Sequence, residues 1–164
     1  MDQQFRTEMN SPVGPLLLLS DGEALQGVYF EQHCPAPADV TGREDRSPFL
    51  EVIDQLEAYF AGTRTAFDFK IAFAGTAFQE AVWSALRQIP HGQTCSYSQI
   101  AADCNRTNAV RAVGAAIGRN PLSIVIPCHR VIGANGALTG FAGGVERKQW
   151  LLQHEGVLAP VASG

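Results

Sequence analysis

Hydrophobic residues near the start of the chain follow the spacing of β-strands. Two apolar runs, Leu16–Leu19 and Leu25–Phe30, lie on either side of Asp21-Gly22, a dipeptide typical of tight turns. In the second run, Val28 and Phe30 fall on one face because side chains alternate along a strand. The pattern therefore predicts a β-hairpin within residues 12–30.

A helix and a further strand are predicted beyond this hairpin. Residues 34–48 contain three prolines and indicate a loop. Ser47-Pro48 then has the form of a helix start, with Ser47 as the N-cap and Pro48 at the first helical position. Apolar residues recur at helical spacing as far as Phe60, and Gly62 is a stop signal. The later alternation predicts a strand through Phe67, Phe69, Ile71 and Phe73.

Helical spacing dominates after Gly75. Thr76 is expected to cap a helix whose apolar side continues to Ile89, before Pro90-His91-Gly92 breaks it. Two short helices with a tight break between them have the size of a helix-turn-helix, although a plain helical hairpin has the same spacing. The expected ranges are Ser98–Cys104 and Asn108–Gly118 for this pair, an Asn135-Gly136 hairpin turn, and Val145–His154 for a last helix.

These elements predict an α+β fold in two domains. The first, residues 1–75, is expected to be an α/β domain with an antiparallel sheet and one main helix. The second, residues 76–164, is expected to be helical and to carry a winged-helix-like helix-turn-helix.

Charge separates the same two parts of the chain. Residues 1–76 carry 5 basic and 12 acidic residues, a balance of −7, whereas residues 77–164 carry 7 and 4, a balance of +3. Only the second part is therefore expected to face a polyanion. The longest apolar run near the N-terminus is too short for an export signal or a membrane span, so we expect a cytoplasmic protein with no membrane association.

One of the four cysteines, Cys128, is followed directly by two basic residues. None of the four cysteines forms a C-x-x-C pair, and no cluster with ligand spacing is present, so we expect no bound metal. Cys128 lies in Ile126-Pro127-Cys128-His129-Arg130-Val131, after an apolar run that looks buried. A cysteine beside basic groups is a candidate nucleophile because nearby cations favour the thiolate. The residues alone also fit a buried structural cysteine or the cysteine of a hydrolase.

The short helix at 108–118 is made mostly of small residues. Gly114 in a helix interior costs about 1 kcal/mol relative to alanine, so its presence needs a reason such as close approach to another surface. Arg111 is the only long polar side chain in this helix before its last turn. The surface that this helix approaches closely is either a neighbouring helix or nucleic acid. A sequence-specific regulator is the less favoured alternative, since it needs several polar side chains that read bases.

Together these motifs resemble the O6-alkylguanine-DNA alkyltransferases, also called methylated-DNA–protein-cysteine methyltransferases, of the short bacterial type. The match covers about residues 10–158 and rests on four further motifs besides the hexapeptide. They are Arg111-Ala112-Val113-Gly114, Asn120-Pro121, Thr139-Gly140-Phe141-Ala142-Gly143-Gly144 and Trp150-Leu151-Leu152-Gln153-His154-Glu155-Gly156.

The resemblance implies a role for each candidate residue. Cys128 would accept the alkyl group, with His129 and Glu155 as its activating relay through a water, and Asn120 would tie the recognition helix to the active-site segment. If residues 128 and 129 are extended, their side chains point to opposite faces. His129 would then not touch the sulfur of Cys128 directly, and a water would be needed to bridge them. Arg111 would enter the base stack, and Ala112, Gly114 and Ala115 would lie against the minor groove. Tyr97, Val131, Phe141 and Ala142 would line the pocket for the flipped base.

The implied reaction is direct reversal of DNA damage by a protein that reacts once. The expected partner is double-stranded DNA carrying O6-alkylguanine, with O4-alkylthymine as a further substrate, and the protein is expected to be a monomer without a cofactor. The alternative within this group is an alkyltransferase-like protein that recognises damage without repairing it. Phe141 and Ala142 stand where some relatives have tyrosine and serine, so we expect a less polar pocket that admits adducts larger than methyl.

Overall fold

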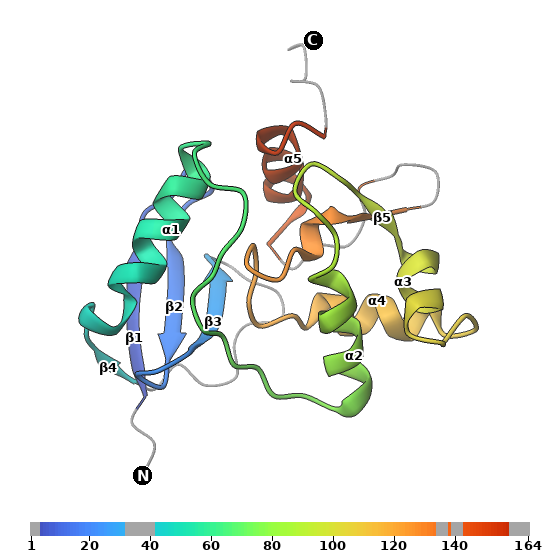
Figure 1. Ribbon diagram of the computed structural model, residues 1–164, viewed down its shortest axis with the longest axis horizontal. Helices are drawn as coiled ribbons and strands as arrows, with labels where there is room; N and C mark the ends of the chain where they lie inside the picture. Colours follow the sequence, from blue (N-terminus) through green and yellow to red (C-terminus); the bar gives the residue numbers. More distant parts are fainter. Residues whose placement is uncertain (1–3, 32–41, 134–137, 139–142, 158–164) are drawn as a thin grey trace. The chain divides into compact units, whose positions relative to one another are not determined.

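The computed structural model describes residues 4–31, 42–133, 138 and 143–157 of the chain. It divides into two compact units (Figure 1). Unit 1 comprises Met1–Ala74 together with Pro121–Val125, and unit 2 comprises Gly75–Asn120 together with Ile126–Gly164. The domain boundary after residue 75 stays a prediction. The inclusion of residues 121–125 in unit 1 was not anticipated from the sequence. Within the described residues, no helix is long and apolar enough to cross a membrane.

Unit 1 is built on a four-stranded sheet with the order β3-β2-β1-β4. The first three strands pair antiparallel, but β4 pairs parallel with β1, so the sheet is mixed rather than antiparallel as expected. The predicted hairpin is confirmed, because Asp21 accepts hydrogen bonds from the N–H groups of Glu23 and Ala24 in its turn. The strands are β1 (Phe5–Met9), β2 (Leu16–Ser20), β3 (Leu25–Phe30) and β4 (Arg43–Glu44).

Two of these strands were not predicted. In β1 the buried Thr7 and Met9 alternate with the exposed Arg6 and Glu8, a weak pattern because threonine replaces an apolar residue. β4 has only two residues, both exposed, and forms through pairing with Phe5 and Arg6 of β1. Neither strand has an alternation of apolar residues strong enough to be predicted from its own sequence.

The strand predicted through residues 67–73 is wrong except at one position. Ile71 forms an isolated parallel bridge with Leu25, and the surrounding residues form no ladder. The free edge of β3 is divided between two segments, because Val28 is bridged in the same way by Leu122. Its N–H donates to the Pro121 carbonyl at 2.9 Å, and its carbonyl accepts from the Ser123 N–H at 3.2 Å. Each segment therefore obtains one bridge instead of a strand.

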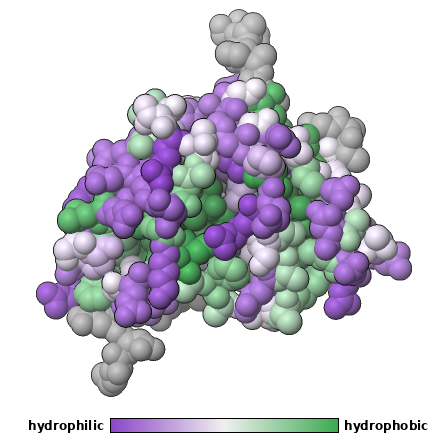
Figure 2. Space-filling view, in the orientation of Figure 1, coloured by the Kyte–Doolittle hydropathy of each residue, from purple (hydrophilic) through white to green (hydrophobic). Residues whose placement is uncertain are grey.

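Helix α1 (Leu50–Phe60) lies against one face of this sheet (Figure 1). It follows a short 3₁₀ turn, η1 (Ser47–Phe49), so Ser47 is the first residue of a turn rather than the N-cap of the helix. The carboxylate of Asp45 accepts hydrogen bonds from both the N–H and the hydroxyl of Ser47 and fixes this entry. The outward side of α1 carries the exposed Glu51, Asp54 and Glu57. Figure 2 shows a mostly hydrophilic surface on the side of the view where Figure 1 draws α1.

Unit 2 contains the predicted helices and a pair of two-residue strands. Thr76 and Gln79 form a reciprocal capping box at the start of α2, as the sequence indicated. The break between α3 and α4 has Asn105 at φ 56°, a conformation that asparagine tolerates better than most residues. The Trp83 indole N–H donates to the Ala116 carbonyl at 2.8 Å and ties α2 to α4. The elements are α2 (Ala77–Leu86), β5 (Cys95–Ser96), α3 (Tyr97–Asp103), α4 (Val110–Gly118), η2 (Cys128–Arg130), β6 (Val131–Ile132) and α5 (Val145–His154).

Candidate active site in the second unit

Two tight turns precede Cys128. Ile124 has φ 73°, and the N–H of Val125 donates to the Ser123 carbonyl at 2.8 Å, which makes a γ-turn that is strained for a β-branched residue. A second turn centres on Pro127, where the Cys128 N–H donates to the Ile126 carbonyl at 2.7 Å. The apolar run is buried as expected, but it bends instead of forming a strand.

Cys128, His129 and Arg130 form the single 3₁₀ turn η2. This corrects the expectation of an extended segment. Successive side chains of a 3₁₀ helix are about 120° apart, so the three side chains still point in different directions. All three are buried, and His129 is fully inaccessible.

Helix α5 supplies the opposite wall. Lys148, Leu151, Leu152 and Glu155 recur at intervals of three and four residues and are all buried on one face, with Glu155 at the C-cap. Because the two leucines anchor this face in the core, the two charged side chains at its ends are carried inward with them. A carboxylate at the C-terminus of a helix opposes the helix dipole, so Glu155 needs partners elsewhere.

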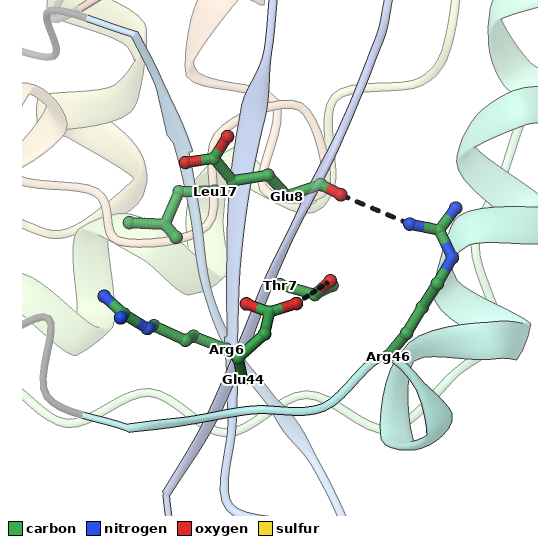
Figure 3. Close-up of a pocket in the computed structure, with 6 residues that line it drawn as sticks. All are labelled: Arg6, Thr7, Glu8, Leu17, Glu44 and Arg46. Carbon is green, nitrogen blue, oxygen red and sulfur yellow. Dashed lines mark hydrogen bonds between the residues drawn. The ribbon is translucent and has the colours of Figure 1, made fainter.

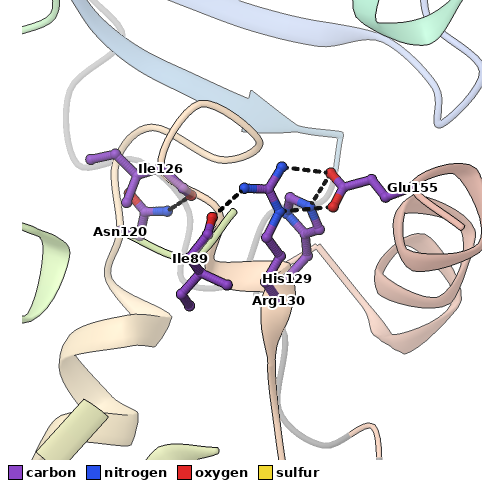
Figure 4. Close-up of polar contacts among 6 residues, drawn as sticks. All are labelled: Ile89, Asn120, Ile126, His129, Arg130 and Glu155. Carbon is purple, nitrogen blue, oxygen red and sulfur yellow. Dashed lines mark hydrogen bonds and ion pairs between the residues drawn. The ribbon is translucent and has the colours of Figure 1, made fainter. Parts of the chain in front are cut away.

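The partners of Glu155 are His129 and Arg130 (Figure 4). His129 Nε2 lies 2.7 Å from Glu155 Oε2. Arg130 donates two hydrogen bonds to the same carboxylate, from Nε to Oε1 at 2.7 Å and from Nη2 to Oε2 at 3.0 Å. The third guanidinium nitrogen of Arg130, Nη1, donates to the Ile89 carbonyl at 2.6 Å. The turn, the end of α5 and the segment after α2 therefore meet at one buried carboxylate.

This network sets the protonation of its members. Burial alone would raise the pKa of Glu155, but hydrogen bonds from His129 and Arg130 hold it well below its usual range, so it is ionised. Burial lowers the pKa of His129 against the opposing pull of Glu155. His129 Nδ1 is buried and has no hydrogen-bond partner among the described residues. The imidazole therefore has one nitrogen committed to Glu155 and one available for chemistry.

The thiol of Cys128 is held in an environment with opposing effects. Burial raises the pKa of Cys128, while a hydrogen bond from the Asn120 side chain and the charge of Lys148 lower it. Asn120 also donates from Nδ2 to the Ile126 carbonyl at 2.8 Å, which ties the end of α4 to the turn before the cysteine. The resting group is a thiol, so a nucleophile forms only when its proton is taken.

Lys148 is the charged group that the sequence did not indicate. It is fully buried, its Nζ lies 5.9 Å from the centre of the Tyr97 ring, and burial lowers its pKa while the Cys128 charge raises it. A lysine without solvent is costly unless an anion or a π-face balances it. The structure thus brings Cys128, Tyr97 and Lys148 together.

The described face of α4 that is turned to solvent contains the expected DNA-contacting residues. Arg111, Ala112 and Ala115 are exposed, whereas Val113, Ala116 and Ile117 are buried. A Cβ added to Gly114 would meet only the Tyr97 ring at 3.9 Å, an ordinary contact. Packing among the described residues therefore does not require this glycine.

Most of the predicted residues lie in unit 2. Val131 is buried in β6, which pairs with Cys95 in β5. Phe141, Ala142 and the Asn135-Gly136 turn lie outside the described residues. Sequence reasoning missed Lys148, and it gave Arg130 only as a basic neighbour of Cys128 and not as the partner of Glu155. The signal that could have found Lys148 was its spacing from Leu151 and Leu152, which places a lysine on an apolar helix face.

A separate open pocket of about 420 Å³ lies on the sheet of unit 1 (Figure 3). Its two arginines are accompanied by two glutamates, so it has no net charge to attract a polyanion. The Glu44 carboxylate accepts from Thr7 at 3.0 Å, and Arg46 donates to the Glu8 carbonyl at 3.3 Å. The candidate residues do not line it.

Replacing Glu155 by glutamine is expected to destabilise the protein in a pH-dependent way. It leaves Arg130 buried without its counterion, which costs roughly 3–5 kcal/mol of unfolding free energy at pH 7. The folded pKa of Glu155 is depressed, so its stabilisation is present above the unfolded value of about 4.3 and is lost as the pH falls further. Urea unfolding at pH 7 and pH 3 measures this. Glu146→Gln, an exposed change in the same helix, is the control, and an equal loss at both pH values contradicts the prediction.

Replacing Lys148 by methionine is expected to raise the pKa of Cys128. Methionine fills similar space but removes the cation that favours the thiolate. The pH dependence of Cys128 carboxymethylation, followed by peptide mass mapping, reports this pKa. Arg147→Met removes a cation from the preceding position as a control. An unchanged midpoint in Lys148→Met would show that its charge does not act on the sulfur.

Family models match nearly the whole described chain. Residues 5–73 match the ribonuclease-like domain of 6-O-methylguanine DNA methyltransferase, and residues 77–157 match the DNA binding domain of the same family.

Individual relatives agree with this. The methylated-DNA–protein-cysteine methyltransferase of Mycobacterium tuberculosis is 46% identical over 95% of this chain and 94% of its own length. That of Methanosarcina acetivorans is 48% identical over 89% of this chain and 94% of its own length. A crystal structure of M. tuberculosis OGT in complex with DNA superposes with a TM-score of 0.89 at 43% identity, covering 96% of each chain. With both of its units matched, this chain belongs to the 6-O-methylguanine DNA methyltransferase family.

Proposed function

We propose that this protein repairs DNA by taking the alkyl group of O6-alkylguanine onto Cys128. The observation that carries the proposal is that Cys128 and His129 share one buried turn, while His129 Nε2 lies 2.7 Å from Glu155 at the end of α5. The curated relatives, 45–48% identical, are named methylated-DNA–protein-cysteine methyltransferases, which supports the same chemistry here.

The proposed reaction is an in-line displacement. The Cys128 proton passes toward His129, the sulfur bonds to the alkyl carbon, and the carbon–oxygen bond breaks with its electron pair going to guanine. Overall the alkyl group moves to sulfur and the thiol proton moves to guanine, so no other reactant is consumed. The thioether that forms has no hydrolysable bond, and each molecule therefore reacts once.

The proposed DNA surface is the exposed face of α4. Between Asp103 and Glu146 the chain has four arginines and no carboxylate, so the segment that contains this helix carries no group that repels phosphates. Arg111 would enter the base stack as the damaged nucleotide leaves it, because a base inside a duplex is out of reach of the buried sulfur. The small Ala112, Gly114 and Ala115 would allow the helix backbone to approach the minor groove.

The remaining assignments follow from this proposal. Tyr97, Val131, Phe141 and Ala142 would line the pocket, and the loss of two hydroxyl groups relative to tyrosine and serine would admit adducts larger than methyl. We also propose O4-alkylthymine as a further substrate, action as a monomer, and work in the cytoplasm, where a bacterial chromosome lies. The alkyltransferase-like alternative is less supported, since those proteins lack the acceptor cysteine that this chain has at position 128.

Incubation with duplex DNA carrying one O6-methylguanine is expected to add one methyl group per protein molecule. Intact mass and peptide mapping locate the group, which should be on Cys128 and should not turn over. The control is Cys104→Ser, which changes the half-buried cysteine at the C-cap of α3 and should keep full transfer. Cys128→Ser should bind the damaged DNA without reacting with it. Tight binding of the lesion by the native protein without any mass gain would favour damage recognition instead.

Replacing Arg111 by glutamine is expected to slow transfer from duplex DNA about tenfold to a hundredfold, since extruding a base costs a few kcal/mol. Transfer from a single-stranded oligonucleotide, whose base is already unstacked, should change little. Arg119→Gln removes the same charge from the exposed C-cap of α4. This control should weaken binding and reduce its salt dependence by about one phosphate contact. Equal effects of Arg111→Gln on both substrates would refute the role in flipping.

A further inference from the structure

Arg130 makes three polar contacts in the site. Two of its nitrogens bind Glu155 at 2.7 Å and 3.0 Å, and a third binds the Ile89 carbonyl at 2.6 Å (Figure 4). Only 7% of its surface is exposed. An arginine fork on a carboxylate is rigid and always charged, so this contact fixes both the position and the charge of Glu155.

Arg130 neutralises the charge of Glu155 while His129 is still uncharged. Glu155 carries one negative charge and Arg130 one positive charge, in direct bidentate contact and away from water. A buried carboxylate with imidazole as its only partner would favour imidazolium, because an uncompensated buried charge is costly. With Arg130 in place the carboxylate is already neutralised, and a second cation at His129 would face the guanidinium across the same oxygen, Oε2.

The geometry also selects one tautomer. Glu155 is ionised and is therefore only an acceptor, so the His129 nitrogen 2.7 Å from it must carry a hydrogen. A neutral imidazole has one N–H, which leaves Nδ1 with its lone pair. Nδ1 is the buried atom that has no hydrogen-bond partner among the described residues.

We propose that Arg130 is a positioning residue that neutralises Glu155, so that His129 rests as the neutral Nε2–H tautomer with Nδ1 ready to accept the Cys128 proton. The use of that proton rests on the proposed function. The charged groups that act on His129 are Glu155 and Lys148 from α5 and Arg130 from its own turn. Both cations disfavour a charged imidazole, and the neutral form is the one that can act as a base.

The native protein provides the first test, without DNA. Nitrogen-15 NMR of the imidazole, assigned by comparison with His129→Gln, is expected to show one protonated and one bare nitrogen at pH 7. An imidazolium signal for His129 at that pH would overturn the proposal. Since no alkyl transfer is involved, failure of the proposed function in the mass experiment is distinguishable from failure here.

Variants of Arg130 provide the second test. Arg130→Gln is expected to raise the pKa of His129 and leave it protonated at neutral pH, because Glu155 then lacks its other cation. Arg130→Lys keeps the charge without the fork and should restore much of the neutral form. Arg87→Gln removes an exposed arginine as the matched control. A purely structural role would lower stability in Arg130→Lys while the pKa of His129 stayed unchanged in both variants, and that result would refute the proposal. If Arg130→Gln does not fold, Arg130→Met, which also removes the charge and fills more of the apolar space, takes its place in the same measurement.

Discussion

The buried carboxylate of Glu155 is the interaction on which the arrangement of the second unit depends. It joins the end of α5 to the turn that holds Cys128 and, through Arg130, to the Ile89 carbonyl beyond α2. A charge without solvent is tolerated only when its partners are complete, so these three segments have one favourable arrangement. The same contact that stabilises the fold orients His129, the proposed base, so a change at Glu155 is expected to affect both stability and the proposed reaction.

Burial of Cys128 creates a conflict that the neighbouring residues resolve. An inaccessible thiol resists ionisation, and its raised pKa protects it from unrelated electrophiles. Asn120 and Lys148 favour the thiolate, and His129 offers a nitrogen that can take the proton. In the proposed reaction the thiolate would form only as His129 takes the proton, so the buried thiol would be kept for alkyl transfer.

The two units divide their electrostatic tasks. The outward side of α1 carries carboxylates, and the pocket on the sheet of unit 1 is lined by two arginines and two glutamates, so neither surface has a positive charge to attract DNA. The chain has no carboxylate between Asp103 and Glu146, the interval that contains α4, and the exposed face of α4 combines Arg111 and Arg119 with alanines. This distribution of charge supports the proposal that DNA binds at α4 of unit 2.

The sequence by itself determined the hairpin, the capped helix at Thr76, the short helix pair, the last helix and the identity of the candidate nucleophile, because each is encoded by residues close together in the chain. It could not determine β4 or the loss of the strand at 67–73, since these depend on which segments compete for the edges of the sheet. It also missed Lys148, and it did not reveal that Arg130 binds Glu155. Their roles arise only when α5 packs against the turn at Cys128 and brings a distant carboxylate and a buried cation to it, and no local pattern records which charges will meet in the core.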